Sequence, residues 1–197
     1  MKKPIEINIT LKKHAVQYFY LLLSKGFKIR FKPGCSIKNL LCQQLGFDET
    51  YVSRRIQTIF LNGKAVDNIN TTVVSDKSTL ALSAAMPGLA GAVFRTGSRY
   101  SVMRNSISYS AHEKQACTGS GVLELKLFNL VAREIGEMIL LRGILVSGKD
   151  LCSVAEEHSE VIGHEDSKIY LNHKKINLGD LLSSGIPGTV YLFITVR

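Results

Sequence analysis

The chain has 197 residues, 45% hydrophobic and 21% charged, a composition that fits one or two folded domains and excludes a largely disordered protein. The longest apolar run, residues 16–23 with Gln17 inside, is far shorter than the roughly 20 residues that span a bilayer. The basic N-terminus leads into an alternating pattern and not into a signal peptide. We therefore expect a cytoplasmic protein. Its formal net charge of +9 is carried by residues 1–121, since acidic side chains slightly outnumber basic ones in residues 122–197.

Four cysteines are spread along the chain, at positions 35, 42, 117 and 152, without a Cys-x-x-Cys pair. A chain of this length does not depend on a disulfide scaffold, so we expect reduced thiols. Cys35 and Cys152 occupy equivalent places in a repeat, each just before an expected helix, where a lowered thiol pKa would permit redox chemistry. Small buried corner residues explain the same pattern.

The first third of the chain predicts strands and helices in alternation. Residues 5–11 alternate apolar and polar side chains, as a half-buried strand does, and residues 12–25 carry apolar residues at helical spacing. In residues 27–32 apolar positions alternate with Lys28, Arg30 and Lys32, which predicts a strand with one cationic face. Ser36 is expected to cap a following helix that ends at Gly46.

The segment 59–92 organises the rest of the first half. Its first strand leads into Asn62-Gly63, the preferred pair for a type I′ hairpin turn. A second strand then ends in the small-residue tail 87–92. Beyond it, residues 96–98 (Thr-Gly-Ser) predict another hairpin turn, and the Ser- and Gly-rich residues 105–121 predict a linker.

The second half repeats the first. Leu123–Leu127 corresponds to Ile5–Ile9, and the pair Leu171-Asn172 corresponds to Leu61-Asn62. Two copies of a strand-helix-strand-helix-strand-strand unit are the simplest interpretation. The predicted fold is therefore α+β, with a first domain over residues 1–92, a hairpin and linker over 93–121, and a second, shorter domain over 122–197.

The unit resembles the small sulfur-carrier proteins of molybdopterin and thiamine biosynthesis. The resemblance rests on the helix start P-G-C-S-I-K-N-L-L, the Leu61-Asn62-Gly63 strand and the tail P-G-L-A-G-A. It covers residues 5–92, and more loosely 123–197, and it implies two tandem ubiquitin-like β-grasp units. Carriers have a C-terminal Gly-Gly that is adenylated and converted to a thiocarboxylate. Gly91 matches the first of these glycines, whereas Ala92 replaces the second and the chain continues beyond it.

We therefore expect a non-catalytic protein that binds another protein and needs neither a cofactor nor a metal. The resemblance suggests an adenylating or sulfur-transfer enzyme as the partner, because carriers insert their tail into such enzymes. The expected docking surface consists of the internal tail and the residues after it: Leu89, Gly91, Ala92, Val93, Phe94, Arg95, Arg99 and Tyr100.

The sequence leaves two other functions open. Basic side chains interleaved with aromatic ones are typical of surfaces that bind RNA or other anions. The candidate anion-binding residues are Lys28, Arg30, Lys32, Arg95, Arg99 and Arg104. Lysines on an edge strand also discourage aggregation, which explains the first three residues without a ligand. The other open function is a latent sulfur carrier that is cleaved after Gly91 or Ala92.

Catalytic and metal-binding patterns are weak. A group of histidines and carboxylates occupies residues 158–166: His158, Glu160, His164, Glu165 and Asp166. Its spacing matches no standard metal site, and a solvated loop explains it. No spacing is diagnostic of a Ser-His-Asp or Cys-His arrangement, and no Gly-rich phosphate loop is present.

Overall fold

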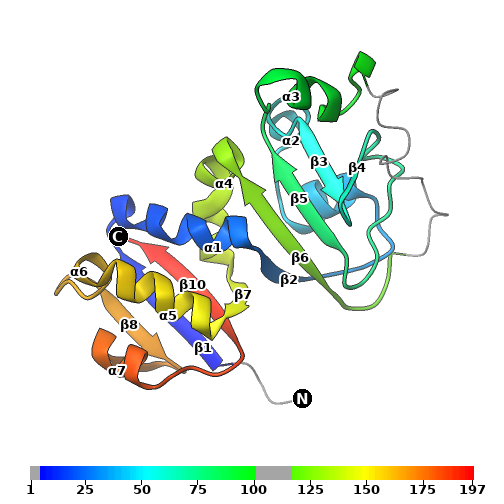
Figure 1. The fold of residues 1–197 in the computed structure, drawn as a ribbon. Coiled ribbons are helices and arrows are strands. Elements are labelled where there is room, and N and C mark those ends of the chain that lie inside the picture. The colour runs from blue at the N-terminus through cyan, green and yellow to red at the C-terminus, as the bar shows by residue number, and fades with distance from the viewer. Residues whose placement is uncertain (1–4, 101–116) are drawn as a thin grey trace. The chain divides into compact units, whose positions relative to one another are not determined.

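The computed structural model describes residues 5–100 and 117–197 (Figure 1). The fold is α+β, with a large mixed sheet and several helices. The chain divides into two compact units. Unit 1 combines residues 1–27 with residues 132–197, and unit 2 consists of residues 28–131.

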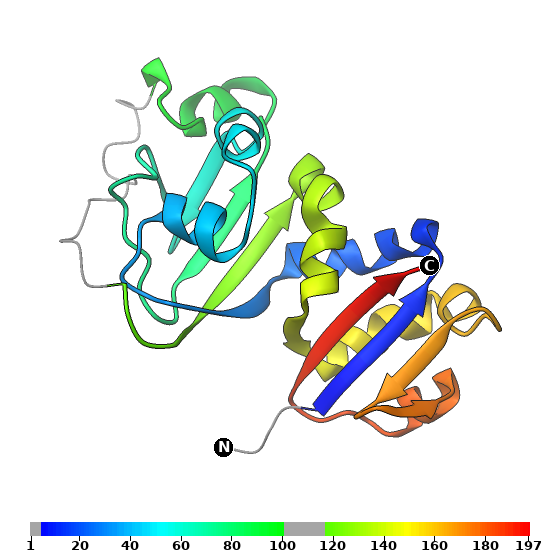
Figure 2. The ribbon, with the colours of Figure 1, turned by 180° about the vertical axis from the view of Figure 1, so that it is seen from behind.

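The sheet of unit 1 has the strand order β7-β10-β1-β8-β9. At its centre β1 runs parallel to β10 and antiparallel to β8, and both views of the ribbon show these three strands side by side (Figures 1 and 2). One face of the central pair is fully buried because every second residue is apolar, as Ile7 and Leu192 illustrate. The bounds are β1 (Ile5–Leu11), β7 (Ile144–Ser147), β8 (Lys168–Leu171), β9 (Lys174–Ile176) and β10 (Thr189–Val196).

Helices cover the buried face of this sheet. η1, a 3₁₀ helix, and α1 follow β1, and they contact β10 and α5 respectively. Their buried side chains include Val16, Phe19 and Leu23. α4 packs closely against α1 at Gly136, which has no side chain. A Cβ atom at this position would lie only 2.9 Å from side-chain atoms of Leu23 and Tyr20. The bounds are η1 (Lys13–Phe19), α1 (Tyr20–Lys25), α4 (Asn129–Arg142), α5 (Gly148–Glu157), α6 (Ser159–Ile162) and α7 (Leu178–Ser183).

The sheet of unit 2 has the strand order β4-β3-β5-β6-β2, with β5 parallel to β6 and antiparallel to β3. Ser36 caps the first helical turn as predicted, because its Oγ accepts a hydrogen bond from Asn39 N at 3.2 Å. Asp48 caps α2 in the same way through Tyr51 N. The bounds are β2 (Phe27–Phe31), η2 (a π-helical segment, Asn39–Gln44), α2 (Glu49–Arg55), β3 (Thr58–Leu61), β4 (Lys64–Ala65), β5 (Thr79–Ser83), α3 (Gly88–Phe94) and β6 (Gly121–Phe128).

The predicted Asn62-Gly63 hairpin is confirmed, and the corresponding place in the second half of the chain also forms a two-residue hairpin. Asn62 and Gly63 join β3 to β4 with φ angles of 51° and 77°, the left-handed conformation that a type I′ turn requires at both positions. Asn172 and His173 join β8 to β9 with φ angles of 48° and 68°. The repeat therefore reproduces this local structure in both halves of the chain.

The two compact units do not coincide with the predicted domains 1–92 and 122–197. β1 lies in unit 1 and pairs with β10, whereas β6 lies in unit 2 and pairs with β5. Each of these strands thus joins the strands of the other repeat. The physical reason is that an alternating pattern determines which face of a strand is buried but not which strand it pairs with.

The prediction of a hairpin after Ala92 is correct for its turn but wrong for the strand before the turn. Residues 88–94 form helix α3, and a turn follows in which Ser98 N donates to Arg95 O at 3.1 Å. Gly97 has a φ of 68°, so the predicted turn exists but follows a helix and not a strand. Residues 101–116, with Arg104 and most of the predicted linker, lie outside the described residues.

Candidate functional site

An open hollow lies beside helix α3. Its volume is about 770 Å³, and it mixes small apolar residues with two arginines and a tyrosine. We call it the α3 hollow. It is lined by Ala85, Met86, Pro87, Gly88, Ala92, Arg95, Gly97, Ser98, Arg99 and Tyr100.

The backbone around the α3 hollow is held against β3. The Phe94 ring lies 5.3 Å from the Phe60 ring, centroid to centroid. Thr96 N donates to Gln57 O at 2.8 Å, which fixes the chain directly after the helix. Gly91 is buried, and a Cβ there would lie 1.8 Å from Met86 O, so only glycine permits this approach. These contacts give the hollow a defined shape.

The structure brings together only part of the predicted docking surface. Ala92, Arg95, Arg99 and Tyr100 line the hollow. Leu89 is 72% exposed, on the same short helix. The other three predicted residues face inwards or are half-buried: Gly91, Val93 and Phe94. The available surface therefore consists of two arginines, an exposed leucine and a half-exposed tyrosine.

The predicted cationic strand face is confirmed on β2. Lys28, Arg30 and Lys32 are exposed, and the residues between them are buried. None of the three lines the α3 hollow. Lys126 on neighbouring β6 pairs with Glu124 at 3.4 Å. The described cations of the anion-binding hypothesis thus belong to two separate sets, one on β2 and one beside α3.

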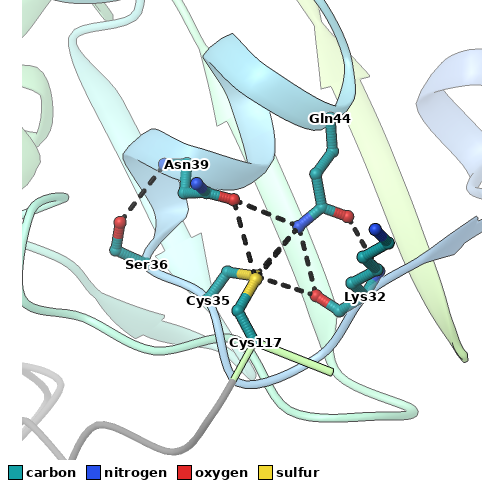
Figure 3. Close-up of a disulfide and its surroundings, with 6 residues drawn as sticks. All are labelled: Lys32, Cys35, Ser36, Asn39, Gln44 and Cys117. Carbon is teal, nitrogen blue, oxygen red and sulfur yellow. Dashed lines mark hydrogen bonds between the residues drawn. A yellow bond between two sulfur atoms is a disulfide. The ribbon is translucent and has the colours of Figure 1, made fainter. Parts of the chain in front are cut away.

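Cys35 and Cys117 form a disulfide in unit 2, with their Cα atoms 4.8 Å apart (Figure 3). The prediction of reduced thiols is therefore wrong for this pair. The two residues are 82 positions apart in the chain, and they meet because the end of β2 lies beside the start of β6. Cys42 and Cys152 are free. Cys152 lies inside α5, so it is not equivalent to Cys35, which precedes its helix.

Gln44 is a residue of this corner that sequence analysis did not single out. Its Oε1 accepts from Lys32 N at 2.7 Å. Its Nε2 lies 3.1 Å from both Lys32 O and Cys35 Sγ, and the amide points at both groups (Figure 3). No feature of the sequence marks this glutamine, because its partners are determined by the turn that brings η2 back to β2.

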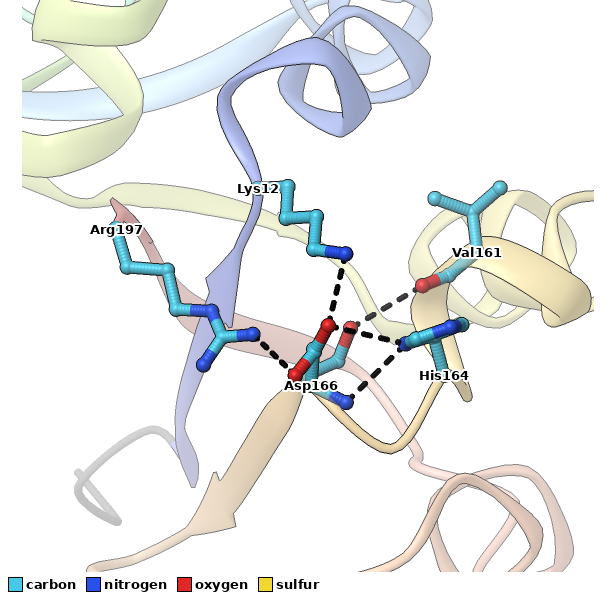
Figure 4. A network of polar contacts seen from close by, with 6 residues as sticks. Lys12, Val161, His164, Asp166 and Arg197 are labelled. Carbon is cyan, nitrogen blue, oxygen red and sulfur yellow. Dashed lines mark hydrogen bonds and ion pairs between the residues drawn. The ribbon is translucent and has the colours of Figure 1, made fainter.

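A polar network closes one end of the sheet in unit 1 (Figure 4). Lys12 Nζ lies 2.8 Å from Asp166 Oδ2, and Arg197 Nη2 lies 2.6 Å from Asp166 Oδ1. Hydrogen bonds from Lys12 and Arg197 lower the pKa of Asp166 to about 2. The network joins the end of β1, the loop before β8 and the last residue of the described chain.

The predicted histidine and carboxylate group does not assemble into a metal site among the residues that the structure describes. His158 stacks on Tyr18, with ring centroids 4.1 Å apart. His164 Nδ1 accepts a hydrogen bond from Asp166 N at 3.2 Å. A small hollow of about 170 Å³ beside this loop is lined by Lys12, His14, Ala15, Glu160, Val161, His164, Asp166 and Ser167. Asp166 instead forms ion pairs with two basic side chains of the same chain, Lys12 and Arg197.

Replacing Asp166 by Asn is expected to destabilise the protein at neutral pH but not in acid. Because the folded-state pKa of Asp166 is lowered from 3.8 to about 2, its contribution is fully present above pH 4 and is lost as the pH falls towards 2. Urea unfolding at several pH values, compared with the exposed neighbour variant Glu165→Gln, measures this. A stability loss in Asp166→Asn that stays constant from pH 7 to pH 2 would contradict the ion-pair explanation.

Comparison with known proteins gives no matching family model, no significantly similar curated protein and no significantly similar solved structure. Within the described part of the chain, no helix is both long and apolar enough to cross a membrane.

Proposed function

We propose that this chain is a non-catalytic protein-binding protein made of two ubiquitin-like β-grasp units, a relative of the sulfur carriers without their chemistry. The mixed sheets support the β-grasp part of the proposal. In unit 1 the central parallel pair of β1 and β10 lies between antiparallel β8 and β7, and in unit 2 the parallel pair of β5 and β6 has β3 as an antiparallel neighbour. The single observation that carries the binding part is the α3 hollow, where exposed apolar and cationic side chains stand on a fixed backbone.

The partner that fits the α3 hollow is a protein with an acidic segment that also carries an apolar residue. Arg95 and Arg99 supply positive charge at the hollow, and the whole chain has a net charge of +9. Leu89 and Tyr100 are 72% and 52% exposed, and they supply apolar surface that a partner would cover. Arginine and tyrosine are enriched among the residues that dominate protein interfaces. An adenylating or sulfur-transfer enzyme is the partner that the resemblance suggests.

Carrier chemistry itself is disfavoured by the position of the tail. A thiocarboxylate needs a free carboxyl group, whereas Gly91 and Ala92 lie inside α3 and are followed by further chain. Gly91 is packed against Met86, so a protease would reach this peptide only after α3 unfolds. A latent carrier would therefore require both cleavage and local unfolding.

Reversing one charge at the α3 hollow tests the proposal. In Arg99→Glu, we expect affinity for the partner captured from a native lysate to fall by about tenfold or more, because a hydrogen bond to a charged group contributes about 1.5–3 kcal/mol. Lys64→Glu on β4 makes the same change in net charge at another exposed site and should bind normally. Equal losses in both variants would show that only overall charge matters and would count against the hollow.

The exposed cations of β2 support a second candidate function, binding of RNA or another anion. Lys28 and Arg30 lie on the exposed face of β2, and Lys32 directly follows the strand. Binding through them would weaken steeply with salt, because each neutralised phosphate releases a counterion. Salt-dependent binding of a mixed-sequence RNA that is lost in Arg30→Glu but kept in Arg99→Glu would favour this function over protein binding.

A further inference from the structure

The two sulfur atoms of the Cys35–Cys117 disulfide lie in unequal surroundings. Cys35 is only 4% exposed, at the corner between β2 and η2, and Val74 N donates to its backbone oxygen at 2.9 Å. Cys117 is exposed, four residues before β6. Thiol–disulfide exchange requires a thiolate to reach one sulfur, so access favours attack at Cys117.

The sulfur that would then leave, Cys35 Sγ, has a hydrogen-bond donor in place. Gln44 Nε2 lies 3.1 Å from Cys35 Sγ but 4.0 Å from Cys117 Sγ. The side chain of Gln44 is held by its bonds to both backbone groups of Lys32. A donor fixed beside one sulfur stabilises negative charge on that sulfur, and a better stabilised thiolate leaves faster.

The two free cysteines do not compete for this chemistry. Burial raises the pKa of the Cys42 thiol and of the Cys152 thiol, so both stay protonated at neutral pH. Both are half-buried. Attack of either free thiol on the disulfide is therefore disfavoured.

From this asymmetry we propose that Cys35–Cys117 is a directional exchange site for a low-molecular-weight thiol, which becomes attached to Cys117 and not to Cys35. The incoming thiolate forms a bond to Cys117 Sγ, and the bond between the two protein sulfurs breaks with its electron pair on Cys35. That thiolate takes a proton from water, and its S–H can then donate to Lys32 O, 3.2 Å away. The thiolate of a second small-molecule thiol then attacks the sulfur of the thiol attached to Cys117 and releases Cys117 as a thiolate. In total, two small thiols are oxidised to a disulfide and the protein disulfide is reduced.

Mapping the site of glutathione attachment tests the direction. The oxidised full-length protein is incubated with glutathione, quenched with N-ethylmaleimide in concentrated urea so that buried thiols also react, digested and analysed by mass spectrometry. We expect glutathione on the Cys117 peptide and N-ethylmaleimide on Cys35. Glutathione on Cys35 in equal or greater amount, or absence of exchange at both cysteines, would overturn the proposal.

The role of Gln44 is tested with a variant that keeps the acceptor for Lys32 N but removes the donor to sulfur. In Gln44→Glu we expect glutathione to open the disulfide roughly tenfold more slowly, and alkylation of Cys35 in the reduced protein to shift to higher pH. Gln43→Glu, on an exposed neighbour, adds the same charge and should react like the parent protein. A shift of equal size in both variants, or in neither, would overturn the assignment of Gln44 as the positioning residue.

Discussion

Fragments 1–108 and 109–197, produced together, are expected to remain associated as a stable complex. β1 from the first fragment pairs with β10 of the second over seven residues, from Ile5 with Val190 to Leu11 with Val196. β5 of the first fragment pairs with β6 of the second over five residues. Ile7, Ile9 and Leu11 are 0% exposed, and burial of three such side chains contributes about 5 to 9 kcal/mol.

The measurement is co-purification through a tag on one fragment, followed by size-exclusion chromatography under native conditions. Cys117 is replaced by Ser so that the disulfide cannot hold the fragments together. Two independent tandem domains with boundaries at residues 92 and 122 would instead elute separately. Separate elution of two folded fragments would therefore contradict the pairing of β1 with β10.

A matched pair of variants shows whether β1 is responsible. Ile9→Asp places a charge on the fully buried face of the strand and should abolish association. Asn8→Asp adds the same negative charge on the half-exposed face of the same strand. It loses the hydrogen bond from Asn8 Nδ2 to Glu6 Oε1, a much smaller cost than a buried charge, and should leave the complex intact. Equal loss in both variants would show that added charge alone separates the fragments.

Local structure could be predicted from the sequence where neighbouring residues decide it. The Asn62-Gly63 hairpin is correct because the turn needs two positive φ angles that this pair tolerates. The cationic face of β2 is correct because a strand alternates its side chains whatever lies beside it. The cap at Ser36 is equally local.

The remaining features depend on residues that are far apart in the chain. The partner of β1 is β10, about 185 residues away, and two similar repeats offer two equally suitable sets of strands. Arg197 reaches Asp166 only because β10 ends beside β1. Residues 88–92 of the predicted tail belong to helix α3, and the position of this helix depends on the contact of Phe94 with Phe60 on β3.

Loss of the disulfide is expected to lower the free energy of unfolding of unit 2 by several kcal/mol. Cys35 and Cys117 are 82 residues apart. Closing a loop of that length in the unfolded chain corresponds to about 4 to 5 kcal/mol in the chain-entropy model, and removal of native disulfides typically costs about 2–5 kcal/mol. Cys117→Ser is the suitable change, because Cys117 is exposed and its replacement leaves no cavity in the core.

Hydrogen exchange read by mass spectrometry measures this loss separately in each unit. Peptides from β5 and β6 in Cys117→Ser should exchange faster than in the parent protein, whereas peptides from β8 and β10 should be unchanged. Cys152→Ser removes a free thiol from unit 1 and serves as the control for unit 2. If the free energy of unfolding of unit 2 falls by less than about 1 kcal/mol in Cys117→Ser, the unfolded chain keeps residues 35 and 117 close together even without the bond. The disulfide would then contribute exchange chemistry to this protein but little stability.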